Sequence, residues 1–532
     1  MKNRTYVFLC IVFIFHSSSW AQLPLSILWE KSLGGSNNDE AYDIQNTNDG
    51  GYIVAGITYS IDGDVTVQKG YGDYWLVKLD SSGEIQWQKS YGGSGEDIAK
   101  SVQQTSDSGY IICGWSASFD QDISNHIGLW DIWVVKTDEN GNIQWEKSLG
   151  GTDWEFSWSI QQTYDDGFII TGWSWSDDGD ITVHYGSWLS SDIWIVKLDS
   201  SGNLEWQKTL GGSDTDRAPE VVQTSDSGYA VAGYSASDDI DVSGHHGSSS
   251  TFDYWIVKLN GSGDIQWQNS YGGTGDDYTQ SIQQTTDKGF IVGGQSRSAD
   301  GDITNHHGGA DSSDFWILKL DSLGNIQWQN SLGGTLYDGA WSAIQTTNGY
   351  GVAGHTTSND GDVQGWHGFT DYWVATLDYA GNLLHQKCLG GTNDEIPYAI
   401  CQSSDGNLVV AGDSKSVDGD VTEHHNTNVY SDYWIVKLTG EDPSIVITPS
   451  VTHISMFPNP VQDFLIIKST TPNKVSIQVN DLQGRQINFF NTGDHPNNNI
   501  QINTKNLFPG FYTVKLIYEK TGFCEVGKFL KQ

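Results

Sequence analysis

Short apolar runs alternate with tight-turn residues along most of the chain. In the stretch 97–149 these runs predict four successive strands, at residues 99–105, 110–116, 131–137 and 143–148. The third strand of the preceding unit alternates residue by residue and is bulky on both faces, with Trp75, Val77 and Leu79 on one and Tyr74, Leu76 and Lys78 on the other. Such a strand indicates a sheet that is packed between two neighbouring sheets.

The connections between these strands have the composition of hairpin turns. The first strand of a unit ends in a sequence such as TSDSG or TYDDG, and the third in one such as DSSG or DENG. Gly adopts positive φ without a steric penalty, and Asp bonds its own turn backbone. We therefore expect two minimal turns per unit on one side and longer connections on the other.

The same pattern returns along the chain with a period near 60. The stretch DYWIVKLNGSGDIQWQNSYGGT at 253–274 has near-copies throughout, and its Trp267 has counterparts at Trp29, Trp87, Trp145, Trp206, Trp328 and His385. These positions are 58, 58, 61, 61, 61 and 57 residues apart. A period of this length with turn residues at fixed offsets indicates a stacked or circular repeat.

The two ends of the repeat region complement each other. The region opens with only a fourth strand, residues 27–33, and its last unit stops after a third strand, residues 432–438. A ring closed by pairing these strands has no unpaired edge between first and last unit, whereas an open solenoid requires capping repeats. We therefore predict an all-β, seven-bladed β-propeller over residues 22–438, closed by the N-terminal strand.

The repeat also resembles a known family. The pattern D-x-W-x-V-K-L-D-x-x-G-x-I-Q-W, then GG[S/T]xx[D/E] and a GYIVAG-type strand, is similar to the bacterial β-propeller repeats called SBBP, over about residues 27–438. The resemblance implies a propeller fold. It implies no single activity, because propellers host many functions.

After a polar linker at residues 439–455 the pattern changes. Short alternating strands with polar turns over residues 456–532 predict a small Ig-like β-sandwich. This segment resembles the type A C-terminal sorting domain of type IX secretion substrates in Bacteroidetes. The matching residues are Pro458, Asn459, Pro460, Leu465, Asp481, Gly484, Arg485, Gly510, Phe511, Tyr512, Lys528 and Lys531. The resemblance implies export by Sec and then by the type IX machinery, to the outer surface or exterior of a Gram-negative bacterium.

The N-terminus has the features of a signal peptide. Lys2 and Arg4 precede an apolar run at residues 6–15, and Ala21 ends a small-residue cleavage site. We expect residues 1–21 to be removed. The run is too short to span a membrane well, and no other stretch competes, so we expect no transmembrane segment in the mature chain.

Charge narrows the possible partners. The formal net charge is −39, and from Ser444 onward eight Lys and Arg face only five Asp and Glu, so the repeats carry the negative charge. Such a field repels phosphate backbones and anionic membranes, which excludes nucleic acid as a partner. The cysteines form no CxxC or metal-binding spacing, and a disulfide between Cys388 and Cys401 stays open.

Acidic residues recur in the connection between second and third strands, which begins with Asp-x-Asp in every unit. Calcium binds six to eight oxygens in flexible loops, so the only cofactor we consider is Ca²⁺. Alternatively, these aspartates cap turns and bond loop backbone. The candidate ligands are Asp62, Asp64, Asp178, Asp180, Asp300, Asp302, Asp360, Asp362, Asp418 and Asp420, with equivalent pairs at Asp120/Asp122 and Asp239/Asp241.

Nine of the fourteen histidines fall in the same connections. A transition-metal site requires three or four ligands that converge at about 2.0–2.1 Å, and equivalent loops of different blades diverge. We therefore expect these histidines to be solvated or bonded to backbone.

Tryptophan is distributed unevenly. Thirteen tryptophans occupy the DxW and IQW columns and are expected in the core, whereas two adjacent units carry seven others. The second-to-third and fourth-to-first connections share one face of a propeller, which we call the long-loop face, and most of these seven fall there. Aromatic planes beside carboxylates are typical of neutral-sugar sites, and the alternative is packing between two blades. The candidate ligand-binding residues are Trp115, Trp130, Trp154, Trp173, Trp175 and Trp188.

Evidence for catalysis is thin. The sequence lacks the GxSxG and HExxH motifs and a Cys/His constellation, and with so many acids any pair could be nominated for a glycosidase. The main hypothesis is a non-enzymatic binding or adhesion module for extracellular glycan or protein. The alternatives are a polysaccharide hydrolase or lyase with acids at the axial mouth, and a calcium-stabilised scaffold.

Overall fold

The computed structural model describes residues 25–309, 311–425 and 428–439. In the C-terminal part it describes residues 455–457, 461–468, 475–480, 486–491, 499–505, 507, 510–518 and 524–531. The predicted signal peptide and nearly all of the predicted linker lie outside these residues. The chain divides into two compact units, Met1–Asp442 and Pro443–Gln532.

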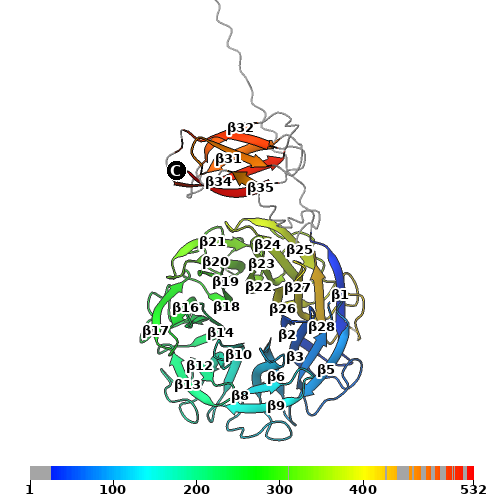
Figure 1. The fold of residues 1–532 in the computed structure, drawn as a ribbon. Coiled ribbons are helices and arrows are strands. Elements are labelled where there is room, and N and C mark those ends of the chain that lie inside the picture. Colours follow the sequence, from blue (N-terminus) through cyan, green and yellow to red (C-terminus); the bar gives the residue numbers. More distant parts are fainter. Residues whose placement is uncertain are drawn as a thin grey trace, which may run out of the picture. The chain divides into compact units, whose positions relative to one another are not determined.

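The first unit is a ring of seven four-stranded antiparallel sheets around a central axis (Figure 1). In each sheet the first strand is innermost. The first four blades are β2 (Asp39–Asn46), β3 (Tyr52–Thr58), β4 (Asp73–Leu79) and β5 (Ile85–Tyr91); β6 (Asp97–Gln104), β7 (Tyr110–Ser116), β8 (Asp131–Thr137) and β9 (Ile143–Leu149); β10 (Glu155–Gln162), β11 (Phe168–Ser174), β12 (Asp192–Leu198) and β13 (Leu204–Leu210); and β14 (Asp216–Gln223), β15 (Tyr229–Ser235), β16 (Asp253–Leu259) and β17 (Ile265–Tyr271). The remaining three are β18 (Asp277–Gln284), β19 (Phe290–Ser296), β20 (Asp314–Leu320) and β21 (Ile326–Leu332); β22 (Asp338–Gln345), β23 (Tyr350–Thr356), β24 (Asp371–Leu377) and β25 (Leu383–Leu389); and β26 (Glu395–Gln402), β27 (Leu408–Ser414) and β28 (Asp432–Leu438), completed by β1 (Ile27–Leu33).

Pairing of the two ends of the propeller closes the ring, which confirms the predicted architecture. Strand β1 lies antiparallel on the outer side of β28, with Glu30 opposite Val436 and Leu33 opposite Tyr433. In Figure 1 the blue β1 flanks the gold β28. Glu30 Oε2 also accepts the indole N–H of Trp434 at 2.9 Å. Strand β1 therefore pairs with the outer backbone edge of the last blade and also bonds its core tryptophan.

The core lies between neighbouring blades. The seven tryptophans of the DxW column are fully buried, as predicted: Trp75, Trp133, Trp194, Trp255, Trp316, Trp373 and Trp434. In four interfaces a tyrosine hydroxyl from one blade donates to the main-chain carbonyl of the next blade's tryptophan, at 2.9–3.0 Å. The IQW tryptophans are half-buried and lie edge-on to an aromatic ring of the following blade, as Trp29 does to Tyr52 at 6.0 Å.

The inner strands bond to one another through side chains. The last residue of six inner strands is a Gln whose amide oxygen accepts a turn N–H of the preceding blade at 2.8–3.1 Å. In three interfaces the seventh residue of the inner strand, Gln103, Gln161 or Gln283, accepts a main-chain N–H of the next blade. These bonds satisfy an edge that would otherwise present unpaired donors to the axis.

The second unit has two antiparallel sheets. One holds β29 (Ser455–Phe457), β30 (Phe464–Lys468) and β33 (Asn499–Asn503), and the other holds β31 (Val475–Asn480), β32 (Gln486–Asn491), β34 (Gly510–Tyr518) and β35 (Cys524–Lys531). Leu465 and Ile467 of the first sheet share one core with Ile477 and Val514 of the second. Two sheets around a common core form a β-sandwich.

The cysteine alternative left open by the sequence is wrong. Cys388 and Cys401 are both free and buried. Cys388 lies on the outermost strand β25 of blade six, whereas Cys401 lies on the innermost strand β26 of blade seven. The two thiols belong to different core clusters, because strands at opposite edges of adjacent blades do not meet.

Candidate functional site

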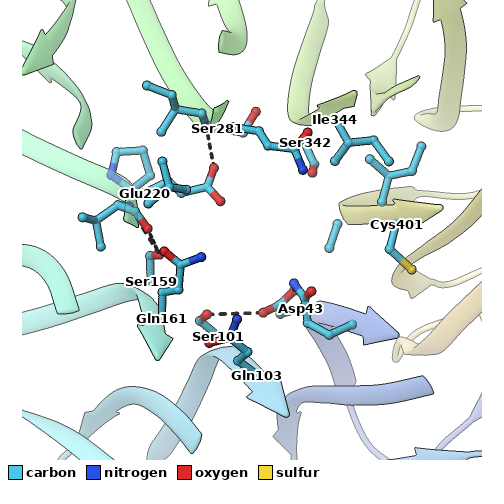
Figure 2. A pocket seen from close by; sticks show the side chains of 18 of the residues that line it. Asp43, Ser101, Gln103, Ser159, Gln161, Glu220, Ser281, Ser342, Ile344 and Cys401 are labelled. Carbon is cyan, nitrogen blue, oxygen red and sulfur yellow. Dashed lines mark hydrogen bonds between the residues drawn. The ribbon is translucent and has the colours of Figure 1, made fainter. Parts of the chain in front are cut away.

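The inner strands surround an axial channel that holds a cavity of about 650 Å³ (Figure 2). All seven innermost strands contribute to its lining. Each inner strand pairs with the second strand of its blade, and this pairing shifts register at the fourth residue, or beside it in β14. The fourth residue is therefore an extra residue that the second strand does not match. Such a bulge changes the direction of a side chain. The fourth residues all line the cavity: Tyr42, Lys100, Trp158, Pro219, Gln280, Trp341 and Tyr398.

The fifth residue of most inner strands links neighbouring blades. Ser101, Ser159 and Ser281 accept a main-chain N–H of the next blade at 3.0–3.4 Å. At the same position Asp43 Oδ2 accepts Val102 N at 2.9 Å, and Glu220 Oε2 accepts Ile282 N at 2.6 Å. Figure 2 shows these side chains around the axis. The two acids thus make the contact that serine makes elsewhere, and burial raises the pKa of Asp43 to about 6 and that of Glu220 to about 8.

Most predicted ligand-binding tryptophans lie in one aromatic cluster. Its hub is Phe156, the second residue of β10. Ring centroids of Trp115, Trp130, Trp173 and Trp175 lie 4.8, 6.2, 6.2 and 5.8 Å from that of Phe156. Trp154 lies 5.8 Å from Trp175, and Trp158 stacks on Trp173 at 5.7 Å. The structure therefore brings together Trp115, Trp130, Trp154, Trp173 and Trp175, with Trp158 as a further member.

The members of this cluster differ in exposure. Trp115 and Trp173 are 9% and 7% exposed, whereas Trp154 is 44% exposed. Trp188 is 80% exposed and, among the described residues, has no aromatic ring contact. The cluster is therefore partly blade packing and partly accessible surface, and Trp188 stands apart on its loop. Phe156 was not among the sequence candidates; its place beside Trp154 at a strand start was the available signal.

Two cations contact the cluster from the flanking blades. Lys100 Nζ lies 3.0 Å from the ring centroid of Tyr42, 4.6 Å from that of Trp158 and 5.1 Å from that of Trp115. The guanidinium carbon of Arg217 lies 5.4 Å from the ring of Trp173 and 5.3 Å from that of Trp175. Both contacts have cation–π geometry. Burial lowers the pKa of Lys100 to about 7.

Aromatic residues continue on the opposite side of the channel. Tyr398 makes edge contacts with Tyr42 at 4.9 Å and Trp341 at 5.0 Å. Trp341 Nε1 donates to His355 Nδ1 at 3.0 Å, and burial lowers the pKa of His355 to about 4. His355 is therefore a neutral acceptor at physiological pH. Blades six, seven, one and three place aromatic rings in the lining of the channel, and blade two places Lys100 there.

The Asp-x-Asp carboxylates bind loop backbone. In each blade Oδ1 of the first Asp accepts the main-chain N–H of the residue after the Gly-Gly pair, as Asp62 Oδ1 does from Ser36 N at 2.7 Å. In six blades Oδ2 of the second Asp accepts the first glycine N–H at 3.2–3.4 Å. Within the described part of the chain no group of three or more His, Cys, Asp or Glu is arranged to hold a metal ion. Calcium binding there stays a prediction.

A second set of acids is buried between blades. The first residues of the inner and third strands are Asp or Glu in every blade and are at most 1% exposed. Asp253 and Asp277 are one such pair: a Cβ on Gly272 would lie 2.5 Å from Asp253 Oδ1 and 2.6 Å from Asp277 Oδ2. Asp277 Oδ2 accepts Gly273 N and Ser298 Oγ. Burial raises the pKa of Asp277 to about 7, and the neighbouring Asp253 carboxylate adds to this increase. The hydrogen bonds that Asp277 accepts act in the opposite direction.

The loop histidines lie against these buried acids. In blades two to five and seven a histidine with 1–9% exposed side chain places Nδ1 3.1–3.9 Å from the aspartate that begins the third strand. His246, His307, His367 and His425 place Nδ1 at 2.8–3.1 Å. Backbone bonds were expected, and four are present. The carboxylate partners were not expected, because the acids are buried strand residues rather than loop residues.

Comparison with known proteins gives one family match. A family model for the Secretion system C-terminal sorting domain matches residues 455–529. The chain carries a type IX sorting domain. The protein is a secreted β-propeller that the type IX system exports to the cell surface or exterior of a Gram-negative bacterium. Of the matching residues, Pro458, Asn459, Pro460, Asp481, Gly484 and Arg485 lie outside the described residues. Gly510 begins β34, Tyr512 is buried in it, and Lys528 of β35 pairs with Thr513.

The other comparisons are distant. Regulatory protein FlaEY of Caulobacter vibrioides is 28% identical over 138 residues, which are 25% of this chain and only 14% of that protein. PorZ, described as an essential bacterial surface component of the type IX secretion system of Porphyromonas gingivalis, is 10% identical with a TM-score of 0.29, over 95% of this chain and 75% of that chain. Puromycin hydrolase is 10% identical with a TM-score of 0.40, over 82% of this chain and 60% of that chain. These similarities indicate no ligand or activity, and the SBBP resemblance remains a resemblance.

Within the described residues no helix could span a lipid bilayer. The sorting domain implies interaction with the type IX machinery during export. It concerns delivery, so the task of the protein after export rests on the propeller.

Proposed function

We propose that the exported propeller is a non-enzymatic binding module for extracellular glycan, and that it binds at the long-loop end of the axial channel. The seven blades repeat the same core tryptophans, loop acids and inter-blade bonds. They differ at the fourth inner-strand residue, where aromatic, cationic, amide and proline side chains line one cavity. The proposal depends on this variation between blades at the axis. A position that only maintained the fold would hold the same type of residue in every blade.

The chemistry of the channel end supports a saccharide ligand. From the exposed ring of Trp154, ring contacts run through Trp175, Phe156 and Trp173 to Trp158, which lines the channel. Aromatic rings offer apolar faces for stacking, and the carboxylates and amides around the axis offer hydrogen bonds to hydroxyl groups. A glycan chain would present both kinds of surface along its length.

A glycan array with the mature protein tests this proposal. Trp154→Ala and Trp175→Ala should each weaken binding of any glycan that scores by about tenfold or more, since each removes a stacking surface. Trp188→Ala is the matched control, because Trp188 is exposed on the same face but does not touch the cluster. Unchanged binding in both cluster variants would place the ligand elsewhere, and an array without any bound glycan would remove the proposal.

A polysaccharide hydrolase or lyase is the second candidate, and Asp43 and Glu220 favour it. Both carboxyl groups line the cavity and have raised pKa values, which is typical of general acids. Their bonds to the next blade weigh against catalysis, because serine makes the same bonds in three other blades. Incubation of the protein with a polysaccharide panel decides between the two: released oligosaccharide that Glu220→Gln abolishes would establish an enzyme.

A further inference from the structure

Hydrogen-bond donors without acceptors gather on one side of the long-loop end of the channel. The indole N–H groups of Trp158 and Trp173 are buried and, among the described residues, have no hydrogen-bond partner. The seven core tryptophans provide the comparison, since each donates its indole N–H to a Gln or Glu at 2.7–3.0 Å. A buried donor that lacks an acceptor is costly, so a donor pair of this kind indicates a missing partner.

Lys100 contacts aromatic rings but lacks a carboxylate partner. Six other lysines are equally buried, on the third strands of their blades, and each reaches a turn aspartate at 2.8–3.1 Å. Lys100 is 8% exposed and lies over aromatic rings, while Glu40 and Asp413 act on it only at longer range. No carboxylate among the described residues lies within ion-pair distance of it. In a protein with 66 acidic and 27 basic residues, a buried cation without a carboxylate needs an explanation.

Arg217 is a second cation beside these indole groups. Its Nε donates to Ser191 Oγ at 3.3 Å, and its guanidinium group lies over Trp173 and Trp175. Lys100 contacts Trp158, Trp158 stacks on Trp173, and Trp173 contacts Arg217. Two cations and two indole donors therefore form one continuous contact network across blades two, three and four, at the channel end where the tryptophans lie.

We propose that this network, Lys100, Trp158, Trp173 and Arg217, binds the carboxylate of an acidic sugar residue in the glycan. The inference rests on the proposed function and names its ligand class. The donors supply charge-assisted hydrogen bonds to a carboxylate, and Arg217 can bind one with two parallel N–H groups. The neighbouring indole rings supply stacking surface for the sugar ring, which a simple inorganic anion would leave unused. The negative charge of the whole propeller repels an acidic ligand at long range, so that the local donors determine the lifetime of the complex rather than the rate of its formation.

Calorimetric titration of the mature protein tests the inference, with tetragalacturonate as the probe and its fully methyl-esterified form as the matched neutral ligand. We expect the free acid to bind about tenfold or more tightly than the ester, as one lost charge-assisted bond would give. Lys100→Met and Arg217→Gln should remove most of that preference. Lys100→Arg should retain it. Lys208→Met is the control, because Lys208 lies on the outer strand of blade three and pairs with Asp264 of blade four.

The outcomes separate this inference from the proposed function. Equal affinity for acid and ester, or a preference that survives in both variants, overturns the carboxylate site. If the ester alone still depends on Trp175, the glycan module stands and the acidic ligand fails. If neither form binds and the array is empty, both fail. A poly-glutamate peptide that binds with the same dependence on Lys100 and Arg217 overturns the saccharide assignment. Melting temperatures within about 2 °C of the wild type show that each variant is folded.

Discussion

Lowering the pH from 8 to 5 should stabilise the propeller through its buried inter-blade carboxyl groups. Asp277 illustrates the sign. Burial raises its pKa from the unperturbed 3.8 to about 7 in the folded protein. Between pH 3.8 and about pH 7 the folded state therefore binds a proton that the unfolded state does not bind. Stability is then fully gained below pH 3.8 and is lost as the pH rises through about 7. Burial raises the pKa of Asp39, Asp216 and Glu395, at the equivalent position, to about 7 as well.

The magnitude follows from the same values. A raised pKa of about three units corresponds to about 4 kcal/mol in full, of which about 2.5 kcal/mol develops between pH 8 and pH 5 for one such group. For a domain of roughly 400 residues this equals about 3 °C in melting temperature per group. His184 and His425, whose pKa values are raised by their aspartates, act in the same direction. Lys100 and His355, whose pKa values burial lowers, act against it.

A single variant isolates the contribution of Asp277, because groups with the opposite pH dependence are the same in the variant and the wild type. Asp277→Asn cannot titrate, so its melting temperature should depend on pH less steeply than that of the wild type, by about 3 °C between pH 8 and pH 5. Asp287→Asn in the same blade is the control. Asp287 bonds Lys319, which helps to lower its pKa, so this variant should be destabilised equally at both pH values. Parallel pH curves for the wild type and Asp277→Asn would refute the reasoning.

Three further predictions test other parts of the structure. Asp300→Ala removes bonds to Thr274 N and Oγ1 and should destabilise the protein by about 1–3 kcal/mol with or without calcium; a rise in melting temperature with Ca²⁺ that this variant loses would instead establish a calcium site. Deletion of residues 25–33 exposes the edge of β28 and should give a lower melting temperature and aggregation in light scattering, while a deletion protein that stays monomeric and equally stable would contradict the closure. Cys388 and Cys401 should both react with a thiol reagent after denaturation without reductant, and missing thiols would indicate a disulfide.

The strands and the closure of the ring were predictable because local chemistry determines them. Turn residues mark each hairpin, and a missing strand at one end with an extra strand at the other leaves one way to complete the last blade. The side chains at the axis could not be predicted in the same way. Alternation would place Tyr42 and Asp43 on opposite faces, whereas the bulge lets both line the channel. Lys100 was missed for this reason, since it is the extra residue of its bulge.

The inner strand also explains how binding residues can vary between blades without weakening the fold. Its fifth and later residues bond the neighbouring blade, through serine or carboxylate near the middle and through glutamine at the end. The fourth residue is extra in the bulge and takes no part in those bonds. Replacement of Lys100 by Trp, as in the next blade at Trp158, would therefore change the lining of the channel while leaving the docking of blades intact. In this repeat the residue that lines the channel and the first residue that bonds the next blade are neighbours in sequence. The ligand site can therefore vary between blades, because substitutions at the fourth residue alter the channel and leave the bonds between blades unchanged.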